Sequence, residues 1–393
     1  MLANRLQGYL RRAPRPTRLV WFLELALAAA AAANCGKTDE DESAGSWTFA
    51  APMIQGRMGH SATRLASGRI LVAGGADSKK NDHNSGYSFS FIATAELYNP
   101  DSNTWTHAAS MATARGFHSA TLLQSGKVLV QGSGFSSCLA DNCSGVVGGV
   151  ELYDPERDIW TEAPAPSVLR TGCHHVKLLD GRIMAIGGIE RIGKPRAFTN
   201  VDIYDPESNT WVEAAPLLEP RTIPSSAILL GGEVLVFGGL VEAGTSTEIY
   251  EPLTNAWRPG PPTLVPHTFG FSTGRQLPSG EAVLEDEVES SEIYSPITGG
   301  WRLAKPSPID ISSLSILAGG HLLVVGEIYN PRALVFDPSA DTWREADRPS
   351  AIGDLHQAGT LPSGEVLLSG GIGDCTATDE FSAATTVMVF TPH

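Results

Sequence analysis

The chain has 393 residues, with 43 acidic and 28 basic side chains and a net charge of −15. Hydrophobic residues make up 42% of it, which supports a folded chain with a large core. The acidic balance excludes the basic surface of a nucleic-acid-binding protein, and 5 cysteines are too few for a disulfide scaffold. The 41 glycines favour tight turns over long helices.

Residues 1–34 are predicted to be a secretory signal peptide. Residues 1–18 contain arginines at five positions and no acid, and an apolar run from Leu19 to Ala33 follows, interrupted only by Glu24. This run is shorter than the ~20 residues that a membrane-spanning helix needs. We therefore expect export, although an uncleaved N-terminal helix is an alternative.

The end of this segment contains a candidate lipidation site. Residues 32–35 read Ala-Ala-Asn-Cys, which resembles a bacterial lipobox with Cys35 as the lipidated residue. Asn34 departs from that pattern, which prefers a small residue there, and ordinary cleavage after Ala33 is the alternative. Residues 35–45 are polar and acidic, as in a flexible tether. The expected location is the bacterial outer membrane, through a lipid on Cys35, or the secreted fraction.

The rest of the chain, residues 46–393, is built from one repeated unit. Seven tryptophans recur at spacings that shorten from 58 to 42 residues, at positions 47, 105, 160, 211, 257, 301 and 343. Each of the last six ends a phrase such as ELYNPDSNTW (96–105) or DIYDPESNTW (202–211). A second phrase lies upstream, for example RMGHSATRLASGRILVAGG (57–75), and its copies in the fifth and sixth units are degenerate.

Each unit is predicted to form four antiparallel strands. The upstream phrase reads as a β-hairpin, because a pair such as Ser67-Gly68 supplies the positive φ that a two-residue turn needs. The apolar run that follows, such as Ile70-Leu71-Val72, is short and branched, as in a buried strand. The Tyr-Asp-Pro phrase gives the third strand and the tryptophan begins the fourth.

Paired glycines after the second strand and a downstream Tyr–Trp pair resemble the kelch repeat. This resemblance covers residues 47–393 and implies an all-β protein, a single seven-bladed β-propeller with four antiparallel strands per blade. The C-terminal phrase VMVFTPH (387–393) is a third strand with no tryptophan after it, whereas Trp47 opens a fourth strand with nothing before it. We therefore expect the N-terminal strand to join the last blade and close the ring, which removes free sheet edges.

The loops between the second and third strands are unequal in length. They are long in four blades that are neighbours around the ring, at 76–94 in blade 1, 133–149 in blade 2, 189–200 in blade 3 and 372–386 in blade 7. Because binding residues tend to lie on loops carried by a rigid scaffold, we expect the ligand-binding face here.

Two columns of polar residues precede the first strand on the same side. Alignment on the hairpin glycine puts arginines in blades 1 to 4, at Arg57, Arg115, Arg170 and Arg221. Three residues later, histidines occupy blades 1, 2 and 7, at His60, His118 and His356. One interpretation is an electropositive pocket mouth that holds a carboxylate or an anionic sugar. The alternative is that these side chains join blade to blade, with acids such as Glu96 as structural partners.

The histidines and cysteines offer further candidate sites. His60, His118 and His356 have the right chemistry for a metal, but nothing in their spacing shows that they converge, and we predict no metal and no cofactor. Cys138 and Cys143 are expected to form a disulfide within one long loop. Cys173 and Cys375 lie on the same face, three blades apart, and either pair or stay free.

The function favoured by these patterns is a non-enzymatic, exported binding module. We expect it to be a monomer that recognises a protein or a glycan through the long-loop face, with no nucleic acid as partner and membrane contact only through a lipid on Cys35. The alternative is a carbohydrate-active enzyme, similar to galactose oxidase or to the bacterial sialic acid mutarotase. The resemblance to galactose oxidase lacks that family's copper ligands, because no Tyr-His pair occurs, and we assign no catalytic residue.

Overall fold

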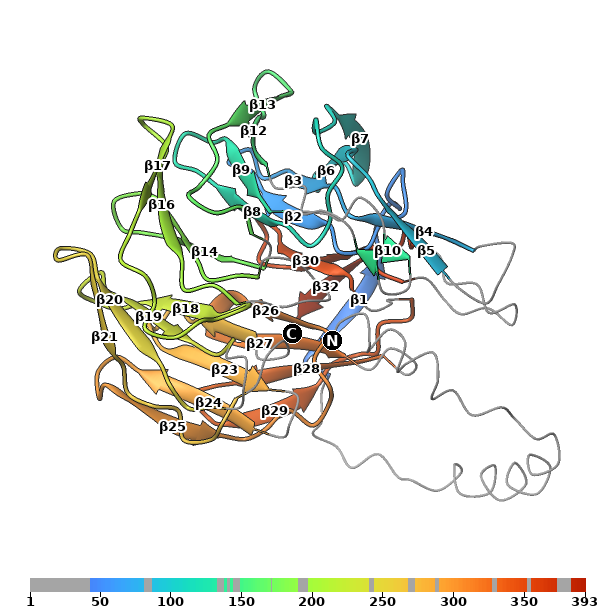
Figure 1. Ribbon diagram of the computed structural model, residues 1–393. Coiled ribbons are helices and arrows are strands. Elements are labelled where there is room, and N and C mark those ends of the chain that lie inside the picture. Colours follow the sequence, from blue (N-terminus) through green and yellow to red (C-terminus); the bar gives the residue numbers. More distant parts are fainter. Residues whose placement is uncertain are drawn as a thin grey trace, which may run out of the picture.

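A computed structural model describes residues 43–80, 87–132, 138–139, 142–143, 149–170, 172–189, 197–239, 244–267, 273–286, 290–326, 331–351, 355–372 and 383–393. These residues form seven four-stranded antiparallel sheets, arranged as the blades of a ring (Figure 1). The predicted all-β, seven-bladed propeller is therefore confirmed. The expected signal peptide, Cys35 and all but the last three residues of the expected tether lie outside the described residues.

Each blade places its first strand innermost and its fourth strand outermost. In blades 1 to 3 these are β2 (Ser61–Arg64), β3 (Ile70–Ala73), β6 (Ala95–Asn99) and β7 (Thr104–Ala108); β8 (Ser119–Leu122), β9 (Val128–Gln131), β12 (Val150–Asp154) and β13 (Ile159–Ala163); and β14 (His174–Lys177), β15 (Ile183–Ile186), β16 (Val201–Asp205) and β17 (Thr210–Glu213).

Blades 4 to 6 have the same order of strands, including the two units whose upstream phrases are degenerate. They are β18 (Ser225–Ile228), β19 (Val234–Phe237), β20 (Glu248–Glu251) and β21 (Ala256–Pro259); β22 (Thr273–Gln276), β23 (Ala282–Asp286), β24 (Ser290–Ser295) and β25 (Gly300–Ala304); and β26 (Ser313–Ile316), β27 (Leu322–Gly326), β28 (Arg332–Asp337) and β29 (Thr342–Glu345), with the 3-10 turn η1 (Ala318–Gly320) between β26 and β27.

Blade 7 combines the two ends of the described chain. Its strands are β30 (Gln357–Thr360), β31 (Val366–Ser369), β32 (Val387–Pro392) and β1 (Gly45–Phe49). Strand β1 pairs with β32 from Gly45 opposite Pro392 to Phe49 opposite Met388, and the Trp47 ring packs 5.0 Å from the Phe390 ring. The N-terminal strand therefore closes the ring, as the sequence predicts.

Apolar clusters between neighbouring blades form the core. The second strands are fully buried, and β3 packs with β9 and β12 in one cluster that spans blades 1 and 2. Each of the seven repeat tryptophans also donates its indole N–H to a carbonyl of the segment that enters its blade. The acceptors for tryptophans 47, 105, 160, 211, 257, 301 and 343 are Asp347, Ala51, Ala109, Pro164, Ala215, Pro261 and Lys305, at 2.7–3.0 Å.

The long loops contain two hairpins of their own. Strands β4 (Ala76–Lys80) and β5 (Tyr87–Phe91) extend outward from blade 1 (Figure 1), and β10 (Cys138–Leu139) pairs with β11 (Asn142–Cys143) in the loop of blade 2. β10 lies beside β5, so the loops of blades 1 and 2 meet. The expected cluster of long loops thus has ordered parts.

Candidate functional site: the mouth of the central channel

Four arginines enter the blades just before the innermost strands, and we call them the arginine girdle. Their side chains form buried ion pairs with an acid on the third strand of the same blade, namely Arg57–Glu96 at 2.5 Å, Arg115–Glu151 at 2.6 Å, Arg170–Asp202 at 2.6 Å and Arg221–Glu248 at 2.8 Å. Burial lowers the pKa of Arg57 and Arg115, while the carboxylate partners oppose that shift.

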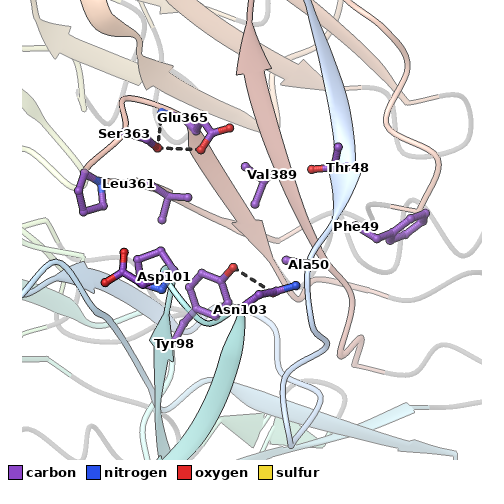
Figure 2. Close-up of a pocket in the computed structure, with 12 residues that line it drawn as sticks. Thr48, Phe49, Ala50, Tyr98, Asp101, Asn103, Leu361, Ser363, Glu365 and Val389 are labelled. Carbon is purple, nitrogen blue, oxygen red and sulfur yellow. Dashed lines mark hydrogen bonds between the residues drawn. The ribbon is translucent and has the colours of Figure 1, made fainter.

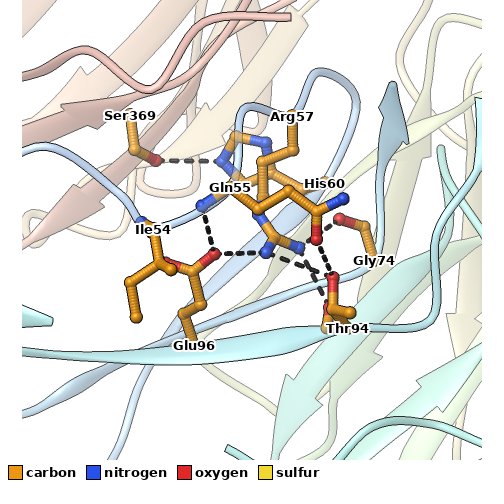
Figure 3. A network of polar contacts seen from close by, with 8 residues as sticks. All are labelled: Ile54, Gln55, Arg57, His60, Gly74, Thr94, Glu96 and Ser369. Carbon is orange, nitrogen blue, oxygen red and sulfur yellow. Dashed lines mark hydrogen bonds and ion pairs between the residues drawn. The ribbon is translucent and has the colours of Figure 1, made fainter. Parts of the chain in front are cut away.

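Arg57 illustrates how a girdle arginine is held within its blade (Figure 3). Its guanidinium donates to the carbonyl oxygens of Gly74 at 2.8 Å and Thr94 at 2.9 Å, both in blade 1. Its own carbonyl accepts the N–H of Gly371 from blade 7 at 3.0 Å. Arg115 repeats this arrangement, because it binds Gly132 of its own blade while its carbonyl accepts from the preceding one.

The girdle acids also hold the segments that enter the blades. Glu96 accepts the N–H groups of Ile54 at 2.7 Å and Gln55 at 3.0 Å in addition to the Arg57 guanidinium (Figure 3). Each carboxylate is therefore shared between a charged side chain and main-chain donors, which is the arrangement that a buried ion needs.

The girdle arginines are not surface donors. Arg57, Arg115 and Arg221 are 0% exposed and Arg170 is 1% exposed. Their guanidinium groups point to acceptors within the protein, so they do not form an electropositive pocket mouth. The acids are structural partners, as the alternative drawn from the sequence expects. The guanidinium groups, however, bind within their own blades, and among the described residues the links to the preceding blade are made by main-chain carbonyls such as that of Arg57.

Blade 5 has a histidine in place of the girdle arginine, at a position that the repeat alignment does not predict. His267 is 1% exposed, and its Nε2 lies 3.0 Å from Glu292, the equivalent of Glu96. Alignment on the hairpin glycine points to Phe269 instead, because the segment before β22 is two residues longer here. Blade 6 replaces the ion pair with Ile309 and Leu334, which belong to one apolar cluster. In blades 1 to 5 the common feature is a buried basic side chain beside an acid of the third strand.

The three predicted histidines also connect neighbouring blades. Each Nε2 pairs with a serine hydroxyl of the preceding blade: His60 with Ser369 at 2.9 Å, His118 with Ser61 at 2.9 Å and His356 with Ser313 at 2.6 Å. The histidine column therefore occupies the inner ring at blades 7, 1 and 2, as its spacing suggests.

Two of these rings are held neutral. Burial, followed by the charges of Arg57, His118 and His356, lowers the pKa of His60 well below its usual value. Burial, followed by the charge of Arg115, lowers the pKa of His118 to about 3. The Nδ1 atoms of both rings are buried, and neither has a hydrogen-bond partner in the described part of the chain.

A chamber of about 200 Å³ opens beside these histidines, in the channel wall at blades 7, 1 and 2. We call it the mouth chamber. Its lining includes His60, His118, Phe117 and Gln357. Within the described residues, no group of three or more His, Cys, Asp or Glu side chains is arranged to hold a metal ion.

The residue before each histidine adopts an unusual backbone conformation. Phe117 and Leu355 have φ of +54° and +61°, a left-handed region that bulky residues rarely adopt. The aligned positions in blades 1 and 3 are Gly59 and Gly172, with φ of +58° and +64°. Phe117 and Leu355 do not stand out in the sequence, although the aligned glycines signal a position that needs positive φ.

The structure describes only part of the two predicted cysteine pairs. Cys138 and Cys143 face each other across the β10–β11 backbone pair, which is the register that the expected disulfide needs. Their side chains, and the whole of Cys375, lie outside the described residues. Cys173 is buried and free.

Comparison with known proteins agrees with this geometry. A family model described as the Kelch motif matches residues 170–218, which contain one girdle arginine and the four strands of blade 3. The seven-bladed ring is thus similar to a kelch propeller, and the family model itself covers blade 3.

Curated proteins similar to this chain include Kelch-like protein 35 from Mus musculus, 28% identical over 50% of the chain and 30% of the relative. Kelch-like protein 15 from Danio rerio is 30% identical over 42% of the chain and 28% of the relative. The F-box/kelch-repeat protein SKIP30 from Arabidopsis thaliana is 26% identical over 48% of the chain and 61% of the relative. The match spans less than a third of the two Kelch-like proteins.

A solved structure with the same fold is a fungal alcohol oxidase in complex with copper. The TM-score is 0.67 at 16% identity, covering 89% of this chain and 76% of the oxidase chain. At that identity the likeness establishes the propeller fold and no shared chemistry.

Proposed function

We propose that this propeller is a binding protein that recognises a protein partner at the mouth of its central channel, over blades 7, 1 and 2. The observation that carries the proposal is the left-handed backbone at Phe117 and Leu355. A non-glycine residue costs about 1–2 kcal/mol in that conformation, and glycine fills the same position in two other blades. Bulky apolar side chains held at this cost indicate a use beyond folding.

The surroundings of Phe117 support a binding surface. Its ring lies edge-on to the ring of Phe91, the last residue of β5, at 6.5 Å. Phe117 N–H donates to the Gly59 carbonyl at 2.7 Å, and Gly59 N–H donates to the Leu355 carbonyl at 3.1 Å. The mouth residues of blades 7, 1 and 2 are thus linked directly, and the girdle beneath them keeps the platform rigid.

The chemistry of the mouth chamber favours an apolar contact with a polar rim. His60 and His118 are neutral near pH 7 because burial lowers their pKa, and Gln357 adds an uncharged amide. Such a chamber suits an apolar side chain on a partner's loop, with serine, histidine and amide groups at its edge.

Glycine substitution tests this proposal. Phe117→Gly and Leu355→Gly remove the apolar side chains and suit the existing φ, so both variants are expected to stay folded. Peptides selected from a displayed random library on the wild-type protein should bind each variant at least about tenfold more weakly by calorimetry. Leu253→Gly, at a fully exposed residue in a turn at the other end of the blades, is the matched control and should bind normally.

The same panel distinguishes the other functions. Selected ligands that bind Phe117→Gly as tightly as wild type, or lose binding to Leu253→Gly, would reject the mouth as the site. Enrichment on a glycan array without peptide ligands would support glycan recognition. Copper-dependent oxidation of a reducing sugar, or mutarotation of sialic acid, would support the enzyme alternative.

We also propose that the chain is exported. The arginine-rich start, the short apolar run and Cys35 support this. Separately, the described residues contain no helix that is long and apolar enough to cross a bilayer. Expression with its own N-terminus in a bacterial host, followed by mass spectrometry, should give a protein beginning at an acylated Cys35. Cys35→Ser should then lose the lipid; an intact N-terminus on the wild type would contradict export.

A further inference from the structure

A second pocket lies at the seam where blade 7 meets blade 1 (Figure 2). It is lined by turns at the opposite end of the blades from the mouth chamber. It has a volume of about 290 Å³ and is formed by the β30–β31 hairpin, the outer strand β1 and the turn after β6. We call it the closing-seam pocket. Its lining includes Thr48, Tyr98, Asp101, Ser363 and Glu365.

The closing-seam pocket is acidic. Asp101 from blade 1 and Glu365 from blade 7 both line it, and none of its lining residues is Lys, Arg or His. Glu365 accepts hydrogen bonds from Ser363 and Thr391 hydroxyls, both at 2.7 Å (Figure 2 shows the Ser363 contact). No ion pair to either carboxylate occurs among the described residues.

Two other seams have a cation at this position. Arg69 and Arg182, each directly after a hairpin glycine, oppose the rise in pKa of Tyr153 and Tyr250 in the next blade. Glu365 holds the same place toward Tyr98, whose pKa is raised by burial and then by this carboxylate. The closing seam thus has an acid where two other seams have a cation.

Blade 4 provides the sharper comparison, because it also has an acid after the hairpin glycine. Glu233 there pairs with Arg258 at 3.5 Å, and Arg258 also pairs with Glu251 at 2.8 Å. Arg258 directly follows the blade's tryptophan, and the residue that directly follows Trp47 is Thr48. Blade 7 therefore keeps the acid and replaces the arginine by a short neutral side chain, which leaves the pocket.

We propose that the closing-seam pocket binds a guanidinium or ammonium group, which takes the place that Arg258 occupies in blade 4. Glu365 and Asp101 supply the charge, and the Tyr98 ring supplies an aromatic wall of the kind that attracts cations. Either a free organic cation or an arginine side chain of a partner protein fits this chemistry.

Calorimetry with agmatine and with an acetylated Gly-Arg-Gly peptide tests the proposal on the full propeller. Wild type should bind one equivalent of at least one of them, and less tightly as salt rises. Thr48→Arg fills the pocket as blade 4 does, and Glu365→Gln removes its central charge. Both should weaken binding at least about tenfold. Agmatine alone would indicate a free cation, and binding of the peptide as well would indicate an arginine side chain.

The matched control is Thr106→Arg, the equivalent change in blade 1, where the residue after the hairpin glycine is Arg69 rather than an acid. It should leave binding unchanged. Thermal unfolding checks that each variant is folded. If Thr48→Arg does not fold, Glu365→Gln alone provides the test. The absence of any saturable binding, equal binding by Thr48→Arg, or binding of Ca²⁺ in place of both organic cations would overturn the proposal. None of these outcomes bears on the mouth chamber.

Discussion

Arg115 and its partners show what each girdle arginine does. Its guanidinium is buried with Glu151 and also donates to the carbonyl oxygens of Gly132 and Gly149 at 2.8 Å. A buried ion pair is weak evidence for net stability, but removing one partner leaves an uncompensated charge. Blade 6 shows that an apolar pair, Ile309 with Leu334, serves at the same place.

Arg115→Ile alone is expected to destabilise the propeller by about 3–5 kcal/mol, because Glu151 stays buried without its counter-ion. Arg115→Ile with Glu151→Leu reproduces the pair of blade 6 and should recover part of that loss. Recovery stays incomplete because Glu151 also binds the N–H groups of Ala112 and Thr113. Urea unfolding measures the free energy of unfolding of both variants. A double variant no more stable than Arg115→Ile alone would contradict this account.

Glu285 is a second buried ionisable residue, at the end of β23. It is 0% exposed, accepts a hydrogen bond from Ser291, and its Oε1 has no hydrogen-bond partner in the described part of the chain. Burial raises its pKa to about 8, and the Ser291 contact partly opposes the shift. This carboxyl is therefore protonated at neutral pH.

Glu285 should make the propeller less stable as pH rises. The unfolded chain releases this proton near pH 4.5, whereas the folded protein keeps it until about pH 8. Stability is therefore full below pH 4.5 and falls between these values by up to about 1.4 kcal/mol per pH unit. Glu285→Gln should remove this loss, so its advantage over wild type grows from pH 5 to pH 9 in urea unfolding. Glu281→Gln, at the hairpin of the same blade, is the control, and equal pH profiles for all three proteins would contradict the assignment.

The sequence identifies the arginine and histidine columns, but it does not show whether their side chains are buried. Arg57 and His60 were found because they recur at fixed distances from a hairpin glycine. Whether such an arginine faces solvent depends on the third strand, which brings Glu96 beside Arg57 from 39 positions away. His267 and Phe117 were missed, because one lies two residues out of register and the other replaces a glycine.

At the scale of elements, the β1–β32 pair carries the closure of the ring. Gly45 begins β1 opposite Pro392, and an added Cβ would lie 2.3 Å from the Phe390 ring and 2.6 Å from the Thr391 carbonyl oxygen. The missing side chain lets β1 lie flat on β32 at this end. The repeats predicted this pairing, because the last unit lacks a fourth strand and Trp47 supplies one.

Gly45→Ala is expected to destabilise the propeller by about 1–3 kcal/mol, since the methyl group must displace Phe390 or β1 itself. Gly300→Ala is the control: Gly300 begins β25, another outermost strand, with open space around the added carbon. Thermal unfolding of the two variants makes the comparison. Equal midpoints would contradict the role given to Gly45.

At the scale of the whole molecule, the fold followed from counting repeats. Seven units, each unable to bury both faces alone, stack so that every blade covers its neighbours, and the seven-bladed ring follows. The outward β4–β5 hairpin could not be predicted from the repeats, because its residues belong to one loop and recur nowhere else. The mouth chamber could not be predicted from the repeats either, since three separate blades contribute its lining.

Removal of residues 1–50 should change the oligomeric state, because it deletes β1 and exposes the edge of β32. We expect larger soluble oligomers or aggregates by light scattering, and a synthetic peptide of residues 43–51 should restore the size of the intact protein. Removal of residues 1–42, which keeps β1, is the control. A monomeric, equally stable protein lacking β1 would show that the ring does not need this strand.

The antiparallel closure also decides how the ring responds to mechanical force. Gly45 and Pro392 lie opposite each other at one end of the β1–β32 ladder, and the His393 N–H donates to the Ala44 carbonyl at 3.1 Å. A pull that separates these two residues opens the ladder rung by rung, at low force. A pull between Gly45 and a ligand held at the channel mouth instead acts along β1, so that the β1–β32 hydrogen bonds bear the force together. Held by its N-terminal side, the propeller would resist traction from a bound partner far better than stretching between its own ends.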